Sequence, residues 1–129
     1  MTILIDTHIL LWYAKGDPRL SSSIRANLEH PQTTCYVSKA SLWEITIKVA
    51  LGKLDLIGSF DDFIDELPWQ GFHLLDINVD DLRTLYTLPF RHGDPFGRLI
   101  IAQALSRRWP VVSDDAKFRQ YSSQLITER

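Results

Sequence analysis

Short apolar runs that alternate with helix-like segments constrain the fold of this chain more than any other feature. The runs are TILID at the start, then TCYV, FHLLDI and PVVS, with SQLIT near the end as a candidate edge strand. Because they are apolar almost throughout, they are typical of strands that are buried on both faces. Such strands occur in parallel sheets whose connecting helices cover both sides. The alternation therefore predicts an α/β fold with a short, mostly parallel central sheet.

Residues that cap helices mark the limits of the segments between these runs. Ser38 is the expected N-cap of a helix that ends just before Gly52, since glycine is common directly after a helix. Asp94 followed by Pro95 predicts the start of a helix that reaches Trp109. Further helices are expected over residues 8–14, 20–29, 60–67 and 78–88.

The length and composition predict one domain over residues 1–129. A folded chain of 14.9 kDa exposes roughly 7,000 Å² and buries enough surface for one core, not two. With 45% hydrophobic and 23% charged residues, the composition excludes a disordered or fibrous protein. The single Cys35 has no internal disulfide partner. Asp6 and His8 interrupt the first apolar stretch, which has no basic leader, so we expect a cytoplasmic protein without a membrane segment.

Charge is distributed unevenly along the chain although the total is only −2. Residues 1–54 carry a net +2, residues 55–81 carry eight acids and no Lys or Arg, and residues 82–129 carry a net +4. A total near zero excludes a protein that coats nucleic acid through overall charge. It leaves room for a local basic rim.

Acidic residues follow the first and fourth predicted strands directly. Asp6 ends the first run, and Asp114 and Asp115 follow the fourth. Glu44 and Asp94 lie near the starts of helices whose N-termini face the same edge. In parallel sheets the functional crevice lies beyond the carboxyl ends of the strands. The pattern therefore predicts that carboxylates from distant parts of the chain converge there.

Such a cluster of carboxylates indicates a bound cation. Crowded carboxylates repel one another, and a divalent ion neutralises them. Oxygen ligands without Cys or paired His favour Mg²⁺ or Mn²⁺ over Zn²⁺. The reaction that most needs these ions is attack of metal-activated water on a phosphodiester.

Each acid also has a structural alternative. Asp6 and Asp94 have the positions of ordinary N-caps, and the acidic pair after the fourth strand could form a turn. Glu44 has the spacing of a capping box with Ser41 and of a helical ion pair with Lys48. Taken one at a time, these positions do not distinguish function from structure.

Four segments together resemble a known family. MTILIDTHILLW, SLWEITIKVALGKL, LPFRHGDPFGRLIIAQAL and VVSDDAKFRQY cover nearly the whole chain in this order. They resemble the PIN-domain ribonucleases, in particular the VapC-type toxins of bacterial toxin–antitoxin pairs. The resemblance implies a three-layer α/β/α PIN-like fold and RNA cleavage with Mg²⁺ or Mn²⁺. It also implies homodimers or complexes with an antitoxin, whose C-terminal segment lies across the acidic groove.

The resemblance assigns three metal-binding, catalytic acids and shows one departure. The matching acids are Asp6, Glu44 within SLWEI, and Asp115, which stands two residues after Ser113. Where the family usually reads His-x-Asp-Pro-Phe-Asp-Arg, this chain reads HGDPFGR, so Gly97 replaces a metal-binding Asp.

Loss of the acid at Gly97 should weaken metal binding and turnover, because the pocket loses one negative charge. Three accounts are open: an inactivating change introduced to allow production of a toxic protein, a natural degenerate toxin, or rescue by water or by Asp94, one helical turn away. Asp94 is thus an auxiliary metal-ligand candidate. We expect reduced or lost activity.

Basic residues near the acids are candidate contacts to the RNA backbone. The candidates are Arg91, Arg98 and Lys117. Arg107 and Arg108, at the end of their helix, have an alternative role as complements of its dipole. The acidic segment 55–81 is expected to face away from RNA as solvated surface.

Apolar residues beside the first two acids are expected to belong mostly to the core. They are Leu11 and Trp12 after Asp6, and Trp43 and Ile47 beside Glu44. An alternative for Trp12 is the wall of a hydrophobic groove for an antitoxin helix.

The expected function is that of an endoribonuclease toxin that uses metal-activated water and leaves a 5′-phosphate and a 3′-hydroxyl. One rival is a catalytically silent PIN fold that binds antitoxin or RNA without cleaving. A second rival is another metal-dependent phosphohydrolase, which predicts turnover of small phosphate esters.

Overall fold

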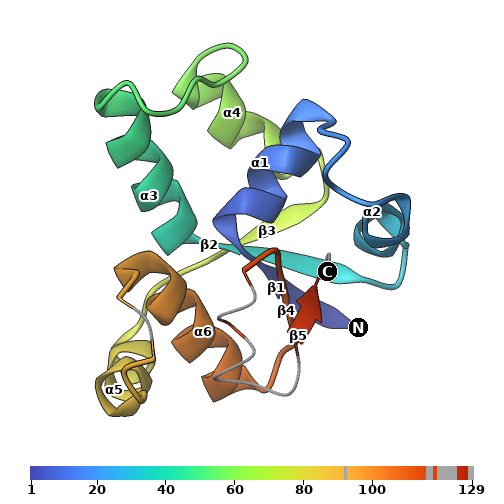
Figure 1. Cartoon of the computed structure of the whole chain (residues 1–129). Coiled ribbons are helices and arrows are strands. Elements are labelled where there is room, and N and C mark those ends of the chain that lie inside the picture. The colour runs from blue at the N-terminus through green and yellow to red at the C-terminus, as the bar shows by residue number, and fades with distance from the viewer. Residues whose placement is uncertain (92, 116–117, 119–124, 128–129) are drawn as a thin grey trace.

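The central sheet of the computed structural model has five parallel strands (Figure 1). The structure describes residues 1–91, 93–115, 118 and 125–127. The strands are β1 (Thr2–Ile5), β2 (Thr34–Ser38), β3 (Phe72–Leu75), β4 (Val111–Ser113) and β5 (Leu125–Thr127). Their order is β3-β2-β1-β4-β5, and every neighbouring pair is parallel. The expected α/β fold is confirmed, including an edge strand within SQLIT.

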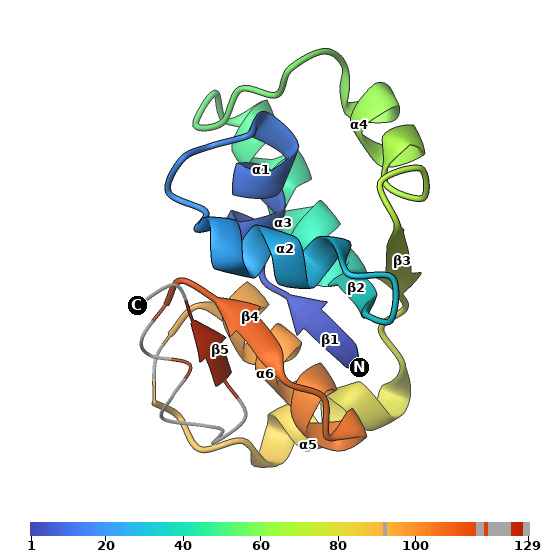
Figure 2. The same ribbon diagram turned by 90° about the vertical axis from the view of Figure 1, so that its right-hand side faces the viewer.

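Helices cover both faces of this sheet. Within the described residues they are α1 (Thr7–Lys15), α2 (Ser22–Glu29), α3 (Lys39–Ala50), α4 (Phe60–Glu66), α5 (Val79–Thr87) and α6 (Pro95–Arg107). Figure 2 shows α1 and α2 on one side of the strands and α5 and α6 on the other, which gives the expected three layers. No helix in this described part is both long and apolar enough to cross a bilayer.

Consecutive residues of β1 contribute to two separate cores. Ile3 and Ile5 pack with Leu10 beneath α1, α2 and α4, whereas Leu4 packs with Ile100 beneath α6. All five side chains are at most 1% exposed. Alternate residues of a strand point to opposite faces, so a sheet covered on both sides requires apolar residues at every position.

The expected caps begin the helices that flank the carboxyl edge of the sheet. The Ser38 side chain accepts a hydrogen bond at the start of α3, and Asp94 does so at the start of α6. The predicted limits differ by up to two residues, most clearly at the start of α2 and the end of α6. The first turn of α2 begins after its N-cap Ser21 instead of at residue 20. Helix α6 ends at Arg107 because Arg108 adopts the left-handed conformation, with φ of 59°.

A buried ion pair joins α5 to α6. Asp81 is 1% exposed, and its Oδ1 lies 2.6 Å from Nη1 of Arg107. Its Oδ2 accepts a hydrogen bond from Nε2 of Gln103 at 3.2 Å, and the backbone N–H of Asn78 donates to the same oxygen. The prediction of a wholly solvated acidic segment is therefore wrong at Asp81. Arg107 pairs within the fold, because a buried carboxylate requires a charged or hydrogen-bonding partner.

Helix α3 presents apolar residues to solvent. Trp43 and Ile47 are 57% and 38% exposed, so the prediction that they belong mostly to the core is wrong. Ile45 of the same helix is fully buried. Residues two positions away lie about 200° around a helix, so Trp43 and Ile47 face outward when Ile45 faces inward. Leu11 and Trp12 are buried, as expected.

Candidate active site

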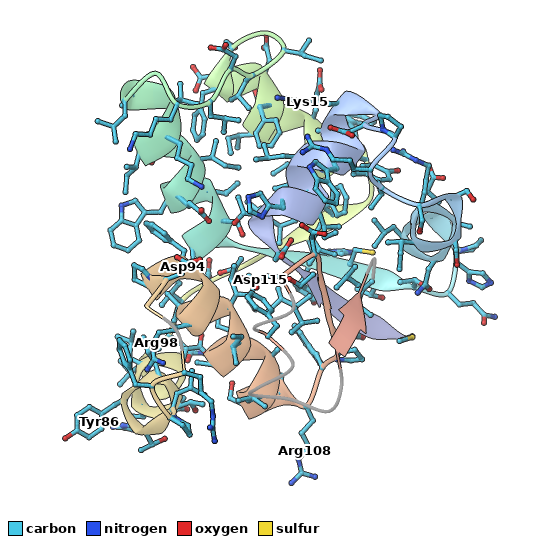
Figure 3. All side chains as sticks on the ribbon, in the orientation of Figure 1. Lys15, Tyr86, Asp94, Arg98, Arg108 and Asp115 are labelled. Carbon is cyan, nitrogen blue, oxygen red and sulfur yellow. The ribbon has the colours of Figure 1, made fainter. Side chains whose placement is uncertain are left out.

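Four carboxylates line one small pocket at the carboxyl ends of the central strands. Asp6 follows β1, and Asp115 lies two residues beyond β4. Glu44 comes from α3, and Asp94 is the N-cap of α6. Figure 3 shows Asp94 and Asp115 near each other beside the start of α6. The pocket has a volume of about 40 Å³, which is room for an ion and one or two waters. The predicted convergence is confirmed.

Asp6 is both a helix cap and a wall of this pocket. Its Oδ1 accepts a hydrogen bond from the backbone N–H of Ile9 at 2.9 Å, and its Oδ2 accepts one from the Ser113 hydroxyl. The side chain is nearly buried, and burial raises the pKa of Asp6 to about 6. The hydrogen bonds from Ser113 and Ile9 act in the opposite direction, but they are outweighed.

Glu44 is held by side chains from two helices. The Thr7 hydroxyl donates to its Oε1 at 2.7 Å, and Nζ of Lys48 lies 2.8 Å from its Oε2. The Thr7 hydroxyl also lies 2.9 Å from that of Ser41. The helical ion pair with Lys48 is confirmed. The capping-box alternative is wrong, because α3 begins at Lys39 and both Ser41 and Glu44 lie inside it.

Ser113 connects the two acids that follow β1 and β4. Its hydroxyl donates to Asp6 and accepts a hydrogen bond from the backbone N–H of Asp115 at 2.9 Å. Ser113 can reach Asp6 because β1 and β4 are neighbours in the sheet. One serine thus fixes the position of both segments.

Gly97 forms part of the pocket wall in the first turn of α6 and is buried. Asp94, one turn earlier, caps the helix by accepting a hydrogen bond from the backbone N–H of Phe96 at 3.1 Å. A side chain at position 97 would therefore start at the wall of the acidic pocket. The helix-cap alternative for Asp94 and its place in the pocket are both correct.

The donor atoms of this pocket fit a hard divalent cation. The four acidic side chains supply carboxylate oxygens, which Mg²⁺ and Mn²⁺ prefer. Asp6 is buried against the neutral partners Ser113 and Ile9, so a cation would compensate its charge. Across the described ranges, no three His, Cys, Asp or Glu groups come together as a ready-made ligand set. The residues fit a cation without forming a rigid cage for it.

The predicted RNA-binding residues do not share one environment. Arg98 is buried and donates to the carbonyl oxygens of Pro89 and Leu88 at 3.0 and 3.3 Å, and Figure 3 shows it beside α5. It therefore holds the loop that precedes α6. Arg91 is exposed on that loop, and Lys117 lies outside the described residues. Contact of these residues with RNA stays a prediction.

Sequence reasoning missed two residues that contribute to the site. His8 lines the acidic pocket, and Ser41 supports the hydroxyl that holds Glu44. Position alone indicates His8, because it stands two residues after Asp6 and residues that close to a strand end also lie at the carboxyl edge of the sheet. No comparable signal identifies Ser41, because its partner Thr7 is 34 residues away.

A model of the PIN domain family matches residues 3–123. The chain belongs to the PIN domain family. The match includes all four acids of the pocket and Gly97. The chain is also 26% identical over 121 residues to Ribonuclease VapC22 of Mycobacterium tuberculosis (strain ATCC 25618 / H37Rv), covering 93% of this chain and 92% of that protein.

Solved structures share the fold of this PIN domain. A chain of VapBC2 from Rickettsia felis, bound to a DNA fragment from its promoter, has a TM-score of 0.71 at 16% identity, with 98% of this chain and 97% of that chain covered. A toxin–antitoxin complex from Klebsiella pneumoniae gives a TM-score of 0.67 at 16% identity, with 98% of each chain covered. At these identities the likeness establishes the three-layer fold.

Proposed function

We propose that this PIN domain is a metal-dependent endoribonuclease and the toxin of a toxin–antitoxin pair. The observation that carries the proposal is the convergence of Asp6, Glu44, Asp94 and Asp115 on one pocket of a PIN fold. A relative of nearly the same length is named a ribonuclease. Structures of similar fold come from toxin–antitoxin complexes, which supports an antitoxin as partner.

Asp6, Glu44 and Asp115 would hold Mg²⁺ or Mn²⁺, with Asp94 as an auxiliary ligand. A metal in this position supplies an activated water and neutralises charge on the phosphodiester. Ser113 orients the Asp6 carboxylate and the Asp115 backbone. Thr7 orients Glu44 through the hydrogen bond from its hydroxyl to Oε1. In-line hydrolysis of RNA would leave a 5′-phosphate and a 3′-hydroxyl.

The surroundings of the site agree with a nucleic acid substrate. Arg91 is exposed on the loop before α6, whose N-terminal turn forms one wall of the pocket. A basic side chain there would hold the RNA backbone against the repulsion of the acids. We place the protein in the cytoplasm with its RNA substrate, as a homodimer or in a complex with antitoxin.

Gly97 lowers activity in this proposal. The pocket lacks the carboxylate that the family usually places at this position, and glycine adds roughly 1 kcal/mol of helix cost relative to alanine. Weaker attraction for a divalent ion follows from the missing charge. Asp94 lines the same pocket and would compensate only in part, because its Oδ1 already caps α6.

Cleavage of total RNA with Mn²⁺ tests the nuclease directly. The unsubstituted chain should produce 5′-phosphate fragments, and Asp6→Ala should not. Asp55→Ala is the matched control, since Asp55 is an exposed aspartate outside the pocket lining. Equal cleavage by the Asp6→Ala and Asp55→Ala proteins would show that the assigned mechanism is wrong.

The glycine in the pocket wall also favours a second candidate, a silent PIN fold that only binds antitoxin or RNA. Gly97→Asp separates the two. A large rise in metal-dependent cleavage or in growth arrest supports a weakened nuclease, and no change in either supports a binding role. Turnover of small phosphate esters instead of RNA would favour another phosphohydrolase.

A further inference from the structure

A second hollow, here called the side pocket, adjoins the acidic pocket along α1. Its volume is about 260 Å³, more than six times that of the acidic pocket. His8 lines both, and the consecutive residues Asp114 and Asp115 line one each. The side pocket extends along α1 to Lys15, and Figure 3 shows Lys15 at the far end of that helix from Asp115. Among the described residues, His8 is therefore the side chain that the two linings share.

Flat groups form part of the wall of the side pocket. The rings of His8 and Trp12 stack with centroids 6.4 Å apart and an interplanar angle of 26°. The guanidinium of Arg19 lies 4.9 Å from the centre of the Trp12 ring. His8 and Arg19 are exposed, so a planar ligand can reach them. Aromatic rings and arginine planes are the surfaces on which nucleobases stack.

The formal charges around the side pocket cancel. Lys15 and Arg19 are matched by Asp17 and Asp114. Arg19 and Asp17 form an ion pair at 2.7 Å, so their charges also neutralise each other locally. A phosphate would meet two carboxylates as well as two cations here and would gain no net attraction, whereas a neutral base would meet both donors and acceptors along its edges. The lining favours a nucleobase over the charged part of a nucleotide.

We propose that the side pocket binds the base of an RNA nucleotide next to the scissile phosphate. The inference rests on the proposed nuclease function, which places that phosphate at the acidic pocket. Because His8 lines both hollows, a base in the side pocket belongs to the nucleotide directly adjoining the cleaved bond. The side pocket thereby contributes to the choice of cleavage site.

Binding of abasic RNAs tests this assignment. The protein carries Asp6→Asn, so that bound RNA is not cut. The probe is a short single-stranded RNA whose cleavage site has been mapped with the unsubstituted protein or with Gly97→Asp. One nucleotide at a time is replaced by an abasic nucleotide, and affinity is measured by fluorescence anisotropy. We expect a loss of about fivefold or more at one nucleotide beside the scissile bond, and little loss at distant positions.

Two variants and a matched control connect that loss to the side pocket. Arg19→Ala and His8→Ala should bind the intact and the abasic RNA almost equally, since the base no longer has its stacking surface. Arg25 lies 4.7 Å from the ring centre of Tyr13, the same kind of contact outside the side pocket. Arg25→Ala should still bind the abasic RNA more weakly than the intact RNA. Thermal unfolding of each variant confirms that it is folded.

Three results would overturn the inference while leaving the proposed function intact. The first is an equal loss at every abasic position, and the second is a loss that persists in Arg19→Ala and His8→Ala. The third is weakened antitoxin binding by these variants without a change in RNA binding. That result would show that the side pocket binds the antitoxin and not RNA. The proposed function fails separately, when Mn²⁺-dependent cleavage does not depend on Asp6. Absence of any RNA binding would overturn both.

Discussion

Two aspartates are nearly inaccessible to solvent in this PIN domain, and their surroundings are opposite. Asp81, between α5 and α6, pairs with Arg107. Burial alone would raise the pKa of Asp81, but hydrogen bonds from Arg107, Asn78 and Gln103 hold it below its usual value. Among the described residues, the hydrogen bonds to Asp6 come from neutral groups, and burial raises its pKa to about 6.

The difference separates a structural carboxylate from one suited to binding. The charge of Asp81 is compensated within the chain, so Asp81 joins two helices and needs no ligand. The charge of Asp6 is not compensated by its hydrogen-bond partners, and it faces a pocket with three further acids. A buried carboxylate whose charge no side chain compensates is stabilised by binding an external cation.

The largest expected effect comes from removing the charge of Asp6. Asp6→Asn should lower Mn²⁺-dependent RNA cleavage by roughly 100-fold or more, since loss of a direct ligand exceeds the effect of losing a residue behind it. The free energy of unfolding should not fall, because asparagine retains the N-cap and a desolvated charge is removed. Cleavage assays and urea denaturation measure both. A marked loss of stability would contradict the comparison.

The matching substitution at the other aspartate should reverse this pattern. Asp81→Asn leaves Arg107 without its carboxylate, and breaking a largely buried ion pair costs about 3 kcal/mol. Urea denaturation should show this loss, while Mn²⁺ affinity of the folded protein stays unchanged. A loss below about 1 kcal/mol would indicate that the pair contributes no more than a surface salt bridge.

A smaller effect is expected from the cation that contacts Glu44. Lys48→Met removes a positive charge 2.8 Å from Oε2, which would otherwise repel a divalent ion. Mn²⁺ should bind about fivefold more tightly in calorimetric titration, which corresponds to about 1 kcal/mol of binding free energy. Lys53→Met removes the same charge just beyond the end of α3 and outside the pocket lining. Equal affinities of the two variants would show that overall charge, not the Glu44 contact, controls binding.

The smallest effect concerns acid stability. Because the pKa of Asp81 is lower in the folded than in the unfolded chain, its contribution is fully present above the ordinary value of 3.8. It is lost as the pH falls through the lowered value. Stability should therefore decline below about pH 4, and Asp81→Asn should have a shallower decline in this range. Parallel stability curves for both proteins would contradict the role of Asp81.

Local patterns predicted the parts of the site that depend on strand ends. Asp6 and Asp115 follow strands, and the carboxyl ends of neighbouring parallel strands must meet. Gly97 was identified by the family motif, and the structure places it in the pocket wall. Contacts across long stretches of sequence, such as the pair of Asp81 with Arg107, were not predictable. The chain contains many acidic and basic residues that could form ion pairs, and only the packing of the helices selects which of them do.

Patterns in the sequence are enough to predict the parallel α/β fold, the convergence of the acids and the missing carboxylate at Gly97. These follow from apolar periodicity, helix caps and a motif, all of which are local. Tertiary packing, in contrast, makes Trp43 face solvent, lets Arg98 hold a loop and places His8 beside the side pocket. A residue's exposure and its partners depend on which helix faces pack against the sheet and against one another, and contacts between residues far apart in the sequence determine that packing.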